Sequence, residues 1–537
     1  MTAAALREAY HRDGLWTNET FADFIDRRVD ADPSVRVRIW SDIAPRSTTT
    51  GEIHRRSRRI AAGLRARGVG VGDVVAYQMP SWAETLEVLW AGFAIGATMV
   101  PIIHFYGAAE VAFILNQSGA KALVTVGGFG KIDHLANLES IRSDVDVETI
   151  VVADTAARAK FLPGAVALSE LADHQPIGAP SAVDPDRPAM IGYTSGTTAE
   201  PKGVIHSHRS LLAEVRQLAS LNVAGGRPSL MASPIAHMTG MLGGSLVPLY
   251  NGDPIELIDR WDPGRVLSIV AAEDLSPGGG ATIFLTSLLD HPDFGDEHLG
   301  RMARFGLGGA PVPAAVAERA EALGIKVTRA YGSTEHPSIT GSPMTDPPDK
   351  RSRTDGRAMA GVELRLVDED GAPVAAGRPG EILSRGPDLF VGYTDPALTE
   401  AAFEPDGWYR TGDVGVLDAD GYHTITDRLS DLIIRGGLNL SAAKIEEHVA
   451  GMAGVAEVAV VAAPDARLGE HACALIRPLP GTTELDLELL HAHLASSGLP
   501  KQQWPEEIRI VEDFDRTPSG KIKKRTLRSQ IAAEAAR

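Results

Sequence analysis

One short segment constrains the fold of this chain more than any other. Residues 193–204 read Tyr-Thr-Ser-Gly-Thr-Thr-Ala-Glu-Pro-Lys-Gly-Val. The apolar residues 188–193 are typical of a buried strand, and leucine and valine recur at helical spacing over residues 211–218. We therefore predict a strand, a small-residue loop and a helix, in which N–H groups, hydroxyls and one cation converge on phosphate oxygens. Composition alone would favour a solvated turn, but the Lys-Gly ending and the flanking elements argue against it.

The segment differs from the common nucleotide-binding loop. The Walker pattern places a glycine directly before its lysine and a serine or threonine directly after it. Here Pro201 precedes Lys202, and Gly203 follows it. The sequence therefore argues against a P-loop nucleotide hydrolase.

The composition is that of a globular protein with more than one domain. The chain has 537 residues, of which 44% are hydrophobic and 23% charged, and this length exceeds what one core supports. The net charge of −18 opposes non-specific binding to nucleic acid or to an anionic membrane. The single cysteine, Cys473, excludes an internal disulfide, favours a cytoplasmic enzyme and is expected to be a small buried hydrophobic residue. Residues 1–10 have no apolar h-region and no uncharged apolar run reaches membrane length, so we expect neither a signal peptide nor a transmembrane segment.

The pattern along the chain predicts several units. Helix and strand patterns alternate over residues 17–126, and again from the loop to about residue 340, which favours parallel sheets covered on both faces. Residues 342–353 are expected to form a polar loop, and β-hairpins follow, with a strong turn signal at Asp420-Gly421. The last part of the chain, from about residue 431, reads as a compact α+β unit that is large enough to fold alone. The predicted fold class is α/β: a large N-terminal domain of two α/β subdomains plus a β-barrel-like subdomain, with a small mobile α+β C-terminal domain.

Seven segments in order along residues 193–522 resemble the motifs of the adenylate-forming superfamily, which includes acyl-CoA synthetases, aryl-CoA ligases, standalone adenylation domains and luciferases. The usual phosphate loop of that superfamily has glycine where this chain has Ala199. If that position requires a positive φ angle, alanine is strained there by about 1 kcal/mol or more. The resemblance implies that the loop surrounds the β- and γ-phosphates of ATP. The residues with this role are Thr194, Ser195, Gly196, Thr197, Thr198 and Lys202, and Thr194 is also implied to lie at Mg²⁺.

Two further motifs are implied to bind the nucleotide. In residues 329–335, Tyr331 offers an aromatic face to adenine and Thr334 reaches the α-phosphate. Glu335 is a hard oxygen ligand suited to Mg²⁺ beside phosphates, whereas a free-standing glutamate would be a solvated charge. Asp413, after Tyr-Arg-Thr-Gly, is implied to accept the ribose hydroxyls, and Arg428 to contact ribose or phosphate. The other implied nucleotide-binding residues are Gly308, Gly309 and Ala310, whose segment an ordinary turn also explains, and Gly332.

The carboxylic acid is implied to bind near His237, where the superfamily has an aromatic residue or histidine that closes over the carboxylate site. Gly240, Gly243 and Gly244 follow, and they either leave an acyl pocket open or pack helices together. Amino-acid-activating relatives carry an aspartate just after this position, but residues 238–241 contain no acidic residue. We therefore expect a medium-length or cyclic hydrophobic carboxylate.

The small domain is implied to serve both steps of the reaction. Lys521 matches the adenylation lysine, which would stabilise the negative charge that develops as carboxylate and α-phosphate join. Gly436 and Gly437 match glycines that approach the pantetheine of coenzyme A. The hinge maps to Ser430, where the superfamily usually has aspartate or lysine, so the domains would span residues 1–429 and 431–537. The basic residues after Lys521 are expected to form a solvated face, and they are Lys523, Lys524, Arg525 and Arg528.

The predicted reaction is RCOO⁻ + ATP → RCO-AMP + PPi, followed by RCO-AMP + CoA-SH → RCO-S-CoA + AMP. The implied catalytic residues are Lys521, Glu335 and His237, and no catalytic serine or cysteine is needed. The resemblance implies that the cofactors and partners are ATP, Mg²⁺, coenzyme A and a small-molecule carboxylic acid. The chain most resembles acyl-CoA synthetases of fatty-acid or cyclohexanecarboxylate type, and residues 501–508 resemble a segment of cyclohexanecarboxylate- and dihydroxybenzoate-type ligases. Two alternatives stay open: transfer of the acyl group to a carrier protein, and an inactive nucleotide- or acyl-binding relative.

Overall fold

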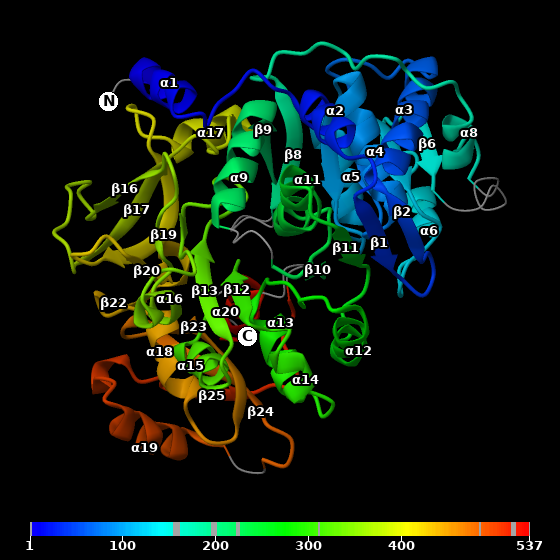
Figure 1. The fold of residues 1–537 in the computed structure, drawn as a ribbon. Helices are drawn as coiled ribbons and strands as arrows, with labels where there is room; N and C mark the ends of the chain where they lie inside the picture. The colour runs from blue at the N-terminus through cyan, green and yellow to red at the C-terminus, as the bar shows by residue number, and fades with distance from the viewer. Residues whose placement is uncertain are drawn as a thin grey trace.

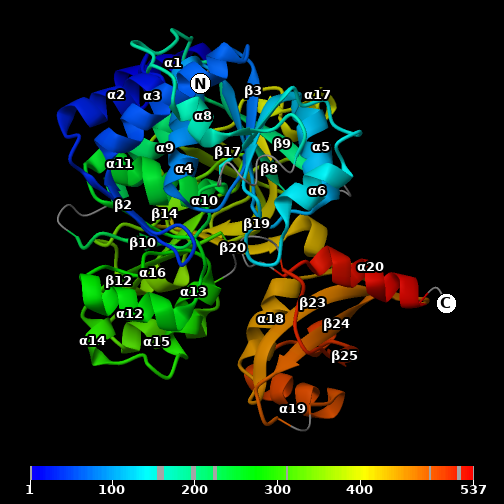
Figure 2. The ribbon, with the colours of Figure 1, turned by 90° about the vertical axis from the view of Figure 1, so that its right-hand side faces the viewer.

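A computed structural model describes residues 3–153, 162–194, 201–221, 226–309, 312–482, 485–516 and 522–535. Most of the chain forms a large N-terminal domain of mixed sheets and helices (Figure 1). The last elements, α18–α20 and β23–β25, gather in a smaller unit at one side of it (Figure 2). The predicted division into a large α/β domain and a small α+β domain is therefore confirmed.

The largest sheet has eight strands in the order β18-β9-β8-β4-β3-β5-β6-β7. Its strands are β3 (Val74–Gln78), β4 (Thr98–Ile102), β5 (Ala120–Thr125), β6 (Thr149–Val152), β7 (Val166–Ala167), β8 (Pro188–Thr194), β9 (Lys202–Ser207) and β18 (Gly392–Tyr393). The helices of this region are α1 (Ala3–Arg12), α2 (Phe21–Ala31), α3 (Thr50–Ala66), α4 (Ala83–Ile95), α5 (Ala108–Ser118), α6 (His134–Ser140), α8 (Leu168–Ala172) and α9 (His208–Leu221). Strands β3 to β8 pair in parallel, as the alternating pattern predicts. Helices α2, α3 and α4 lie on one side of the sheet, and α5 and α6 lie on the other (Figure 2).

The candidate phosphate loop joins two antiparallel strands, so the prediction of strand, loop and helix is wrong at its third element. Thr194, the last residue of β8, pairs with Lys202, the first residue of β9, and the hairpin continues through Gly192 and Val204. The helix predicted after the loop is α9, but it begins only at His208. Strand β9 was not predicted, because its two adjacent apolar residues are too few to show the alternating pattern of a strand. The N-terminus of α9 is therefore separated from the loop by a whole strand.

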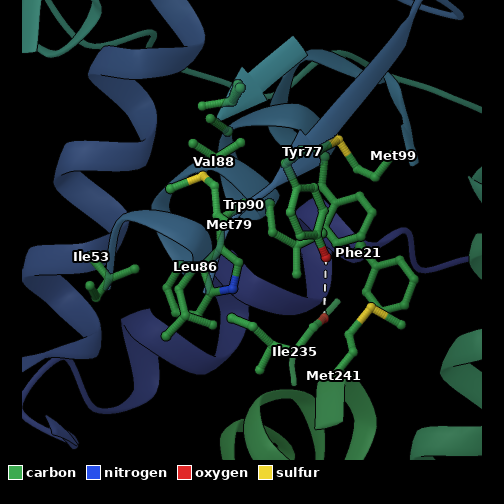
Figure 3. Packing of buried hydrophobic residues seen from close by; sticks show 14 of the residues in the cluster. Phe21, Ile53, Tyr77, Met79, Leu86, Val88, Trp90, Met99, Ile235 and Met241 are labelled. Carbon is green, nitrogen blue, oxygen red and sulfur yellow. Dashed lines mark hydrogen bonds between the residues drawn. The ribbon is translucent and has the colours of Figure 1, made fainter. Parts of the chain in front are cut away.

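The main hydrophobic core packs the N-terminal helices against the large sheet and against the segment that leads to His237. Phe21, Tyr77 and Trp90 are fully or almost fully buried in it. The Tyr77 hydroxyl donates a hydrogen bond of 3.2 Å to the carbonyl of Ile235 (Figure 3). This bond satisfies a buried polar group and fixes the backbone two residues before His237.

Two smaller sheets complete the α/β part. The first has the order β10-β11-β1-β2 and the second the order β12-β13-β14-β15. Their strands are β1 (Arg36–Trp40), β2 (Arg46–Thr49), β10 (Leu230–Met231), β11 (Ile255–Ile258), β12 (Arg304–Gly308), β13 (Lys326–Tyr331), β14 (Thr340–Gly341) and β15 (Arg357–Ala358). The nearby helices are α10 (Met238–Met241), the π-helix η1 (Leu242–Leu246), α11 (Val247–Asn251), α12 (Pro263–Glu273), α13 (Thr282–Leu289), α14 (Asp296–Leu299), α15 (Ala314–Ala322) and α16 (Pro348–Arg353). The prediction of a loop over residues 342–353 is wrong for its second half, which forms helix α16. Pro348 occupies the first helical turn, where proline is favourable.

The predicted barrel-like subdomain contains a four-stranded antiparallel sheet in the order β16-β17-β19-β20. Its elements are β16 (Glu363–Val367), β17 (Pro379–Arg385), α17 (Pro396–Ala402), β19 (Tyr409–Leu417) and β20 (His423–Arg428). The predicted hairpin between β19 and β20 is confirmed. Asp418 N–H donates to the Tyr422 carbonyl at 2.9 Å, and Gly421 adopts a φ of +83° in the turn.

In its described residues, the small unit combines one sheet with three α-helices. The sheet order is β22-β21-β24-β23, and β25 pairs with β24. Its elements are η2 (Leu429–Asp431), β21 (Ile433–Arg435), β22 (Leu438–Leu440), α18 (Ala442–Ala450), β23 (Val455–Asp465), β24 (Gly469–Pro478), α19 (Leu487–Ser497), η3 (Lys501–Gln503), β25 (Glu507–Ile510) and α20 (Lys524–Ala535). Cys473 is buried on β24, as predicted. Within the described part of the chain, every helix is too short or too polar to cross a membrane.

Candidate active site

Three residues predicted to bind the nucleotide lie in direct contact. Tyr331 ends β13, and its hydroxyl donates to Asp413 Oδ2 at 2.7 Å. Arg428, which pairs with Asp413 across β19 and β20, places its Nε 3.0 Å from Asp413 Oδ1. Each carboxylate oxygen can accept two hydrogen bonds, so Asp413 keeps acceptor capacity for ribose hydroxyls.

The electrostatics of this group keep each member in one charge state. Desolvation, together with the Asp413 carboxylate, raises the pKa of Tyr331 well above its ordinary value. The same carboxylate raises the pKa of Arg428. Tyr331 therefore stays a neutral donor and Arg428 a cation at neutral pH.

Glu335 and Lys202 meet at an aromatic residue that the sequence interpretation missed. The hydroxyl of Tyr393, on β18, donates to Glu335 Oε1 at 2.8 Å. Lys202 Nζ lies 5.4 Å from the centre of the Tyr393 ring. Burial and the Glu335 charge raise the pKa of Tyr393, so it remains a donor. A single tyrosine on a two-residue strand leaves no periodic signal, although the adjacent Gly392 marks an unusual backbone position.

The turn after β13 approaches the strand that leads into the phosphate loop. A Cβ atom on Gly192 would lie 3.1 Å from Thr334 Cγ2, so the strand β8 and this turn are in close contact. A Cβ atom on Gly332 would lie 2.0 Å from the Pro337 carbonyl oxygen, which only glycine avoids. Ser333 N–H closes the turn by donating to the His336 carbonyl at 2.9 Å. Thr194, Thr334 and Glu335 therefore belong to neighbouring segments.

The glycine segment predicted to lie along adenine ends β12. A Cβ atom on Gly308 would lie 3.1 Å from the Ala330 carbonyl oxygen, because β12 and β13 pair in parallel. Gly309 adopts a φ of +74° with open space beside its Cα. The positive φ angle alone explains a glycine at this position. This agrees with the ordinary turn that was the alternative explanation of the segment.

The structure supports packing rather than an open pocket at two of the predicted acyl-pocket glycines. A Cβ atom would lie 2.1 Å from the Pro234 carbonyl oxygen at Gly240, and 2.7 Å from Met231 Cγ at Gly244. His237 caps α10, with its Nδ1 accepting from Thr239 N–H at 3.3 Å. Of the two alternatives, helix packing is therefore supported: α10 packs closely on the 233–234 backbone at Gly240, and η1 packs on β10 at Gly244.

The glycines predicted to approach coenzyme A form the turn between β21 and β22. Gly436 and Gly437 have φ angles of +57° and +85° between the paired residues Arg435 and Leu438. A two-residue hairpin turn with positive φ at both positions strongly favours glycine, so local conformation alone explains this pair. Ser430, the predicted hinge, lies in η2, and its carbonyl accepts from Arg528 at 3.1 Å.

Six predicted site residues lie outside the described part of the chain, and they are Ser195, Gly196, Thr197, Thr198, Ala310 and Lys521. The residues on either side of the Lys521 segment are held in place. Arg516 and Ile522 form a β-bridge, and Arg516 Nη1 lies 2.8 Å from Glu457 Oε1.

The prediction of a solvated basic face after Lys521 is wrong for Lys524. Its side chain is only 21% exposed, and its Nζ lies 2.7 Å from Glu446 Oε1. Arg528 pairs with Glu470 in addition to the Ser430 carbonyl. Lys524 thus contacts α18, and Arg528 contacts β24 and the predicted hinge, because α20 packs along the sheet of the small domain.

Comparisons with known proteins give matches along most of the chain. The family model described as AMP-binding enzyme matches residues 25–394, and the one described as AMP-binding enzyme C-terminal domain matches residues 444–521. The medium-chain fatty-acid–CoA ligase of Escherichia coli (strain K12) is 32% identical over 529 residues, which cover 98% of this chain and 93% of that protein. The 3-[(3aS,4S,7aS)-7a-methyl-1,5-dioxo-octahydro-1H-inden-4-yl]propanoyl:CoA ligase of Rhodococcus jostii (strain RHA1) is 34% identical over 493 residues, covering 90% and 93%. The crystal structure of ATP-bound MatB from Rhodopseudomonas palustris has a TM-score of 0.84 at 28% identity, covering 95% of this chain and 98% of that one. The matches therefore span both the large and the small domain.

Proposed function

Because the chain belongs to the family of AMP-binding enzymes, we propose that it is an AMP-forming acyl-CoA ligase. In the first step a carboxylate oxygen attacks the α-phosphorus of ATP, a C–O–P link forms and pyrophosphate leaves. In the second step the sulfur of coenzyme A attacks the acyl carbon, AMP leaves, and the thiol proton is released. The observation that carries this proposal is the contact of Tyr331, Asp413 and Arg428 beside the turn that holds Glu335.

The residues of this group have complementary tasks. Asp413 is oriented by Tyr331 and Arg428 to accept the ribose hydroxyls, and Thr334 lies near the α-phosphate. Lys202 and the hydroxyls of the phosphate loop surround the departing pyrophosphate, whose charge grows as the α-phosphate is attacked. Lys521 supplies the positive charge between carboxylate and α-phosphate.

The donor set at Glu335 fits Mg²⁺ held together with substrate phosphates. The described residues contain no group of three His, Cys, Asp or Glu side chains that would hold a metal unaided. Mg²⁺ commonly binds through one or two carboxylates and phosphate oxygens, which a single oriented carboxylate satisfies. When bound, Mg²⁺ supplies charge neutralisation at the phosphates; Glu335, fixed by Tyr393, and Thr194 would hold it.

The two steps are proposed to use two orientations of the small domain. The domains would span residues 1–429 and 431–537, with the hinge at Ser430. Lys521 and the Gly436–Gly437 turn belong to the same unit but are needed in different steps, so rotation about the hinge resolves the conflict. Coenzyme A would approach Gly436 and Gly437 in the second orientation.

A hydrophobic carboxylic acid is the proposed substrate. Residues 238–241 after His237 offer no carboxylate to bind a substrate ammonium. The two relatives described above are named for a medium-chain fatty acid and for a fused-ring propanoate, both largely apolar. His237 would close over the carboxylate of this acid. We also propose a cytoplasmic location, on the basis of the single cysteine.

A panel of carboxylic acids tests this proposal. Straight-chain acids of increasing length, cyclic acids and amino acids are each incubated with ATP and Mg²⁺, with and without coenzyme A. Pyrophosphate release measures adenylation, and AMP release measures the complete reaction. We expect coenzyme A-dependent AMP release, fastest with hydrophobic acids. Adenylation without any stimulation by coenzyme A would favour a carrier protein as acceptor, and no adenylation of any acid would favour an inactive relative.

A further inference from the structure

A buried polar cluster joins the turn of residues 332–338 to three other parts of the large domain. Each side chain in it is at most 6% exposed. The members are His206 on β9, Glu214 on α9, His336 and Ser338 in the turn, Ser384 on β17 and Asp388 after β17. None of them belongs to the set of predicted site residues, yet the turn between them carries Thr334 and Glu335.

The side chains of the turn are held by two acidic residues and a serine. Ser338 Oγ donates to Glu214 Oε1 at 2.6 Å. His336 Nδ1 lies 2.8 Å from Ser384 Oγ, and its Nε2 lies 3.2 Å from Asp388 Oδ1. A Cβ atom on Gly386 would lie 2.8 Å from His336 Nε2, so a glycine at that position leaves room for the contact.

The carboxyl groups of Glu214 and Asp388 influence each other's charge state. Among the described residues of this cluster, Glu214 Oε2 and Asp388 Oδ2 have no hydrogen-bond partner in the structure. Burial, and next the Asp388 charge, raise the pKa of Glu214 well above its ordinary value. A protonated Glu214 can donate to Asp388, whereas two ionised carboxylates in this site would repel each other.

The backbone of the same turn is held from two further directions. His206 Nε2 donates to the Thr334 carbonyl at 2.7 Å, and burial lowers the pKa of His206 to about 4, so this ring is neutral. Phe390 N–H donates to the Glu335 carbonyl at 2.8 Å. The backbone carbonyls of Thr334 and Glu335 and the side chains of His336 and Ser338 are therefore each held by residues outside the turn.

We propose that Glu214 and Asp388 are positioning residues for adenylate formation, acting through Ser338 and His336 to hold Thr334 and Glu335 where the Mg²⁺-bound phosphates of ATP need them. This inference rests on the proposed function, because it takes Glu335 as the residue that faces Mg²⁺. A displacement of about 1 Å in such a site can lower the rate by about 10²-fold even when the altered residue never touches substrate.

Substitutions at Glu214 separate positioning from general stability. Glu214→Gln keeps an acceptor for Ser338 and supplies N–H groups that can donate to Asp388, so we expect KM for Mg·ATP within about 3-fold of the wild type. Glu214→Ala leaves Ser338 and Asp388 without this partner, and we expect KM for Mg·ATP to rise about 10-fold or more while KM for the acid changes much less. Affinity for Mg·ATP is also measured without turnover, from the ligand-induced shift of the unfolding temperature across Mg²⁺ concentrations.

Glu87 provides the matched control. It is a fully buried glutamate on α4, and its oxygens contact Arg46 and Arg56 rather than the active site. We expect Glu87→Ala to lower the unfolding temperature but to leave the affinity of the folded enzyme for Mg·ATP unchanged. If Glu214→Ala does not fold, Ser338→Ala breaks the same link with a smaller change, and a rise in KM for Mg·ATP of about 3-fold or more is expected.

Two results would overturn the proposal. The first is an affinity for Mg·ATP that falls no further in Glu214→Ala and Ser338→Ala than in Glu87→Ala. The second is an affinity for Mg·ATP in Glu214→Gln that is as low as in Glu214→Ala. A wild-type protein that binds Mg·ATP but adenylates no acid would instead contradict the proposed function. In that case the comparison of Mg·ATP affinities among the variants still decides the positioning role.

Discussion

At the scale of single residues, the candidate site is built from charges that are each paired with an oriented donor. Tyr331 and Arg428 direct Asp413, and Tyr393 directs Glu335. Tyr331, Glu335, Asp413 and Arg428 could be predicted from the sequence because each stands in a distinctive run of neighbours. Tyr393 could not, because its importance arises only where β18 pairs with β9 and brings it beside Glu335.

Lys521→Ala should lower the rate of adenylate formation by about 10²-fold or more, because a charge contact made in the transition state is lost. Attack of coenzyme A on supplied acyl-AMP should survive. The two half-reactions are measured separately, as acid-dependent pyrophosphate exchange and as thioester formation. The exposed Lys523, two residues away, is the control, and Lys523→Ala should leave both rates unchanged. Equal losses in both half-reactions would contradict the assigned role.

At the scale of elements, long periodic segments were predictable and short ones were not. The helices α2 and α3 and the hairpin between β19 and β20 carry clear periods or a strong turn signal. Strand β9 is six residues long and contains only two adjacent large apolar residues, so its pairing with β8 could not be predicted from the sequence. Helix α16 is short and polar, with one proline at its N-cap and one in its first turn, a composition that the sequence interpretation assigned to a loop.

The element that joins the two domains is tested by Ser430→Pro. Proline fixes φ near about −65°, so the hinge loses the freedom that a domain rotation needs. If the adenylating orientation is retained, pyrophosphate exchange should persist while thioester formation from supplied acyl-AMP falls, which is the reverse of the effect of Lys521→Ala. Ser430→Ala keeps the backbone free and should retain both rates. Unchanged half-reactions in Ser430→Pro would mean that the chain bends at another residue.

At the scale of the whole molecule, the fold buries several histidines in their neutral form. Burial lowers the pKa of four of them to about 4, and they are His104, His206, His208 and His423. An unfolded histidine has a pKa near 6.5, so between these values the unfolded state binds more protons than the folded state. The stability of the fold should therefore be intact above about pH 6.5 and should fall as the pH is lowered toward 4.

His423→Phe tests this dependence, because phenylalanine keeps a ring beside Tyr331 but cannot bind a proton. The wild type should lose about 2 kcal/mol more of its free energy of unfolding than the variant between pH 7.5 and pH 5. Urea unfolding at a series of pH values gives the measurement. The control is His11→Phe, at an exposed position, which should follow the wild-type pH dependence. Parallel pH curves for the wild type and His423→Phe would show that this histidine does not contribute to acid unfolding.

The fate of one oxygen atom tests the central claim, that the chain activates a carboxylic acid by forming an acyl-adenylate. A hydrophobic acid that serves as substrate is labelled with ¹⁸O at both carboxylate oxygens, turned over with ATP and coenzyme A, and the AMP is analysed by mass spectrometry. Because the carboxylate oxygen becomes the bridge to the α-phosphorus and stays there when sulfur attacks the acyl carbon, the account predicts one ¹⁸O atom in each AMP formed. AMP without ¹⁸O, or ¹⁸O recovered in orthophosphate with ADP as the nucleotide product, would contradict it.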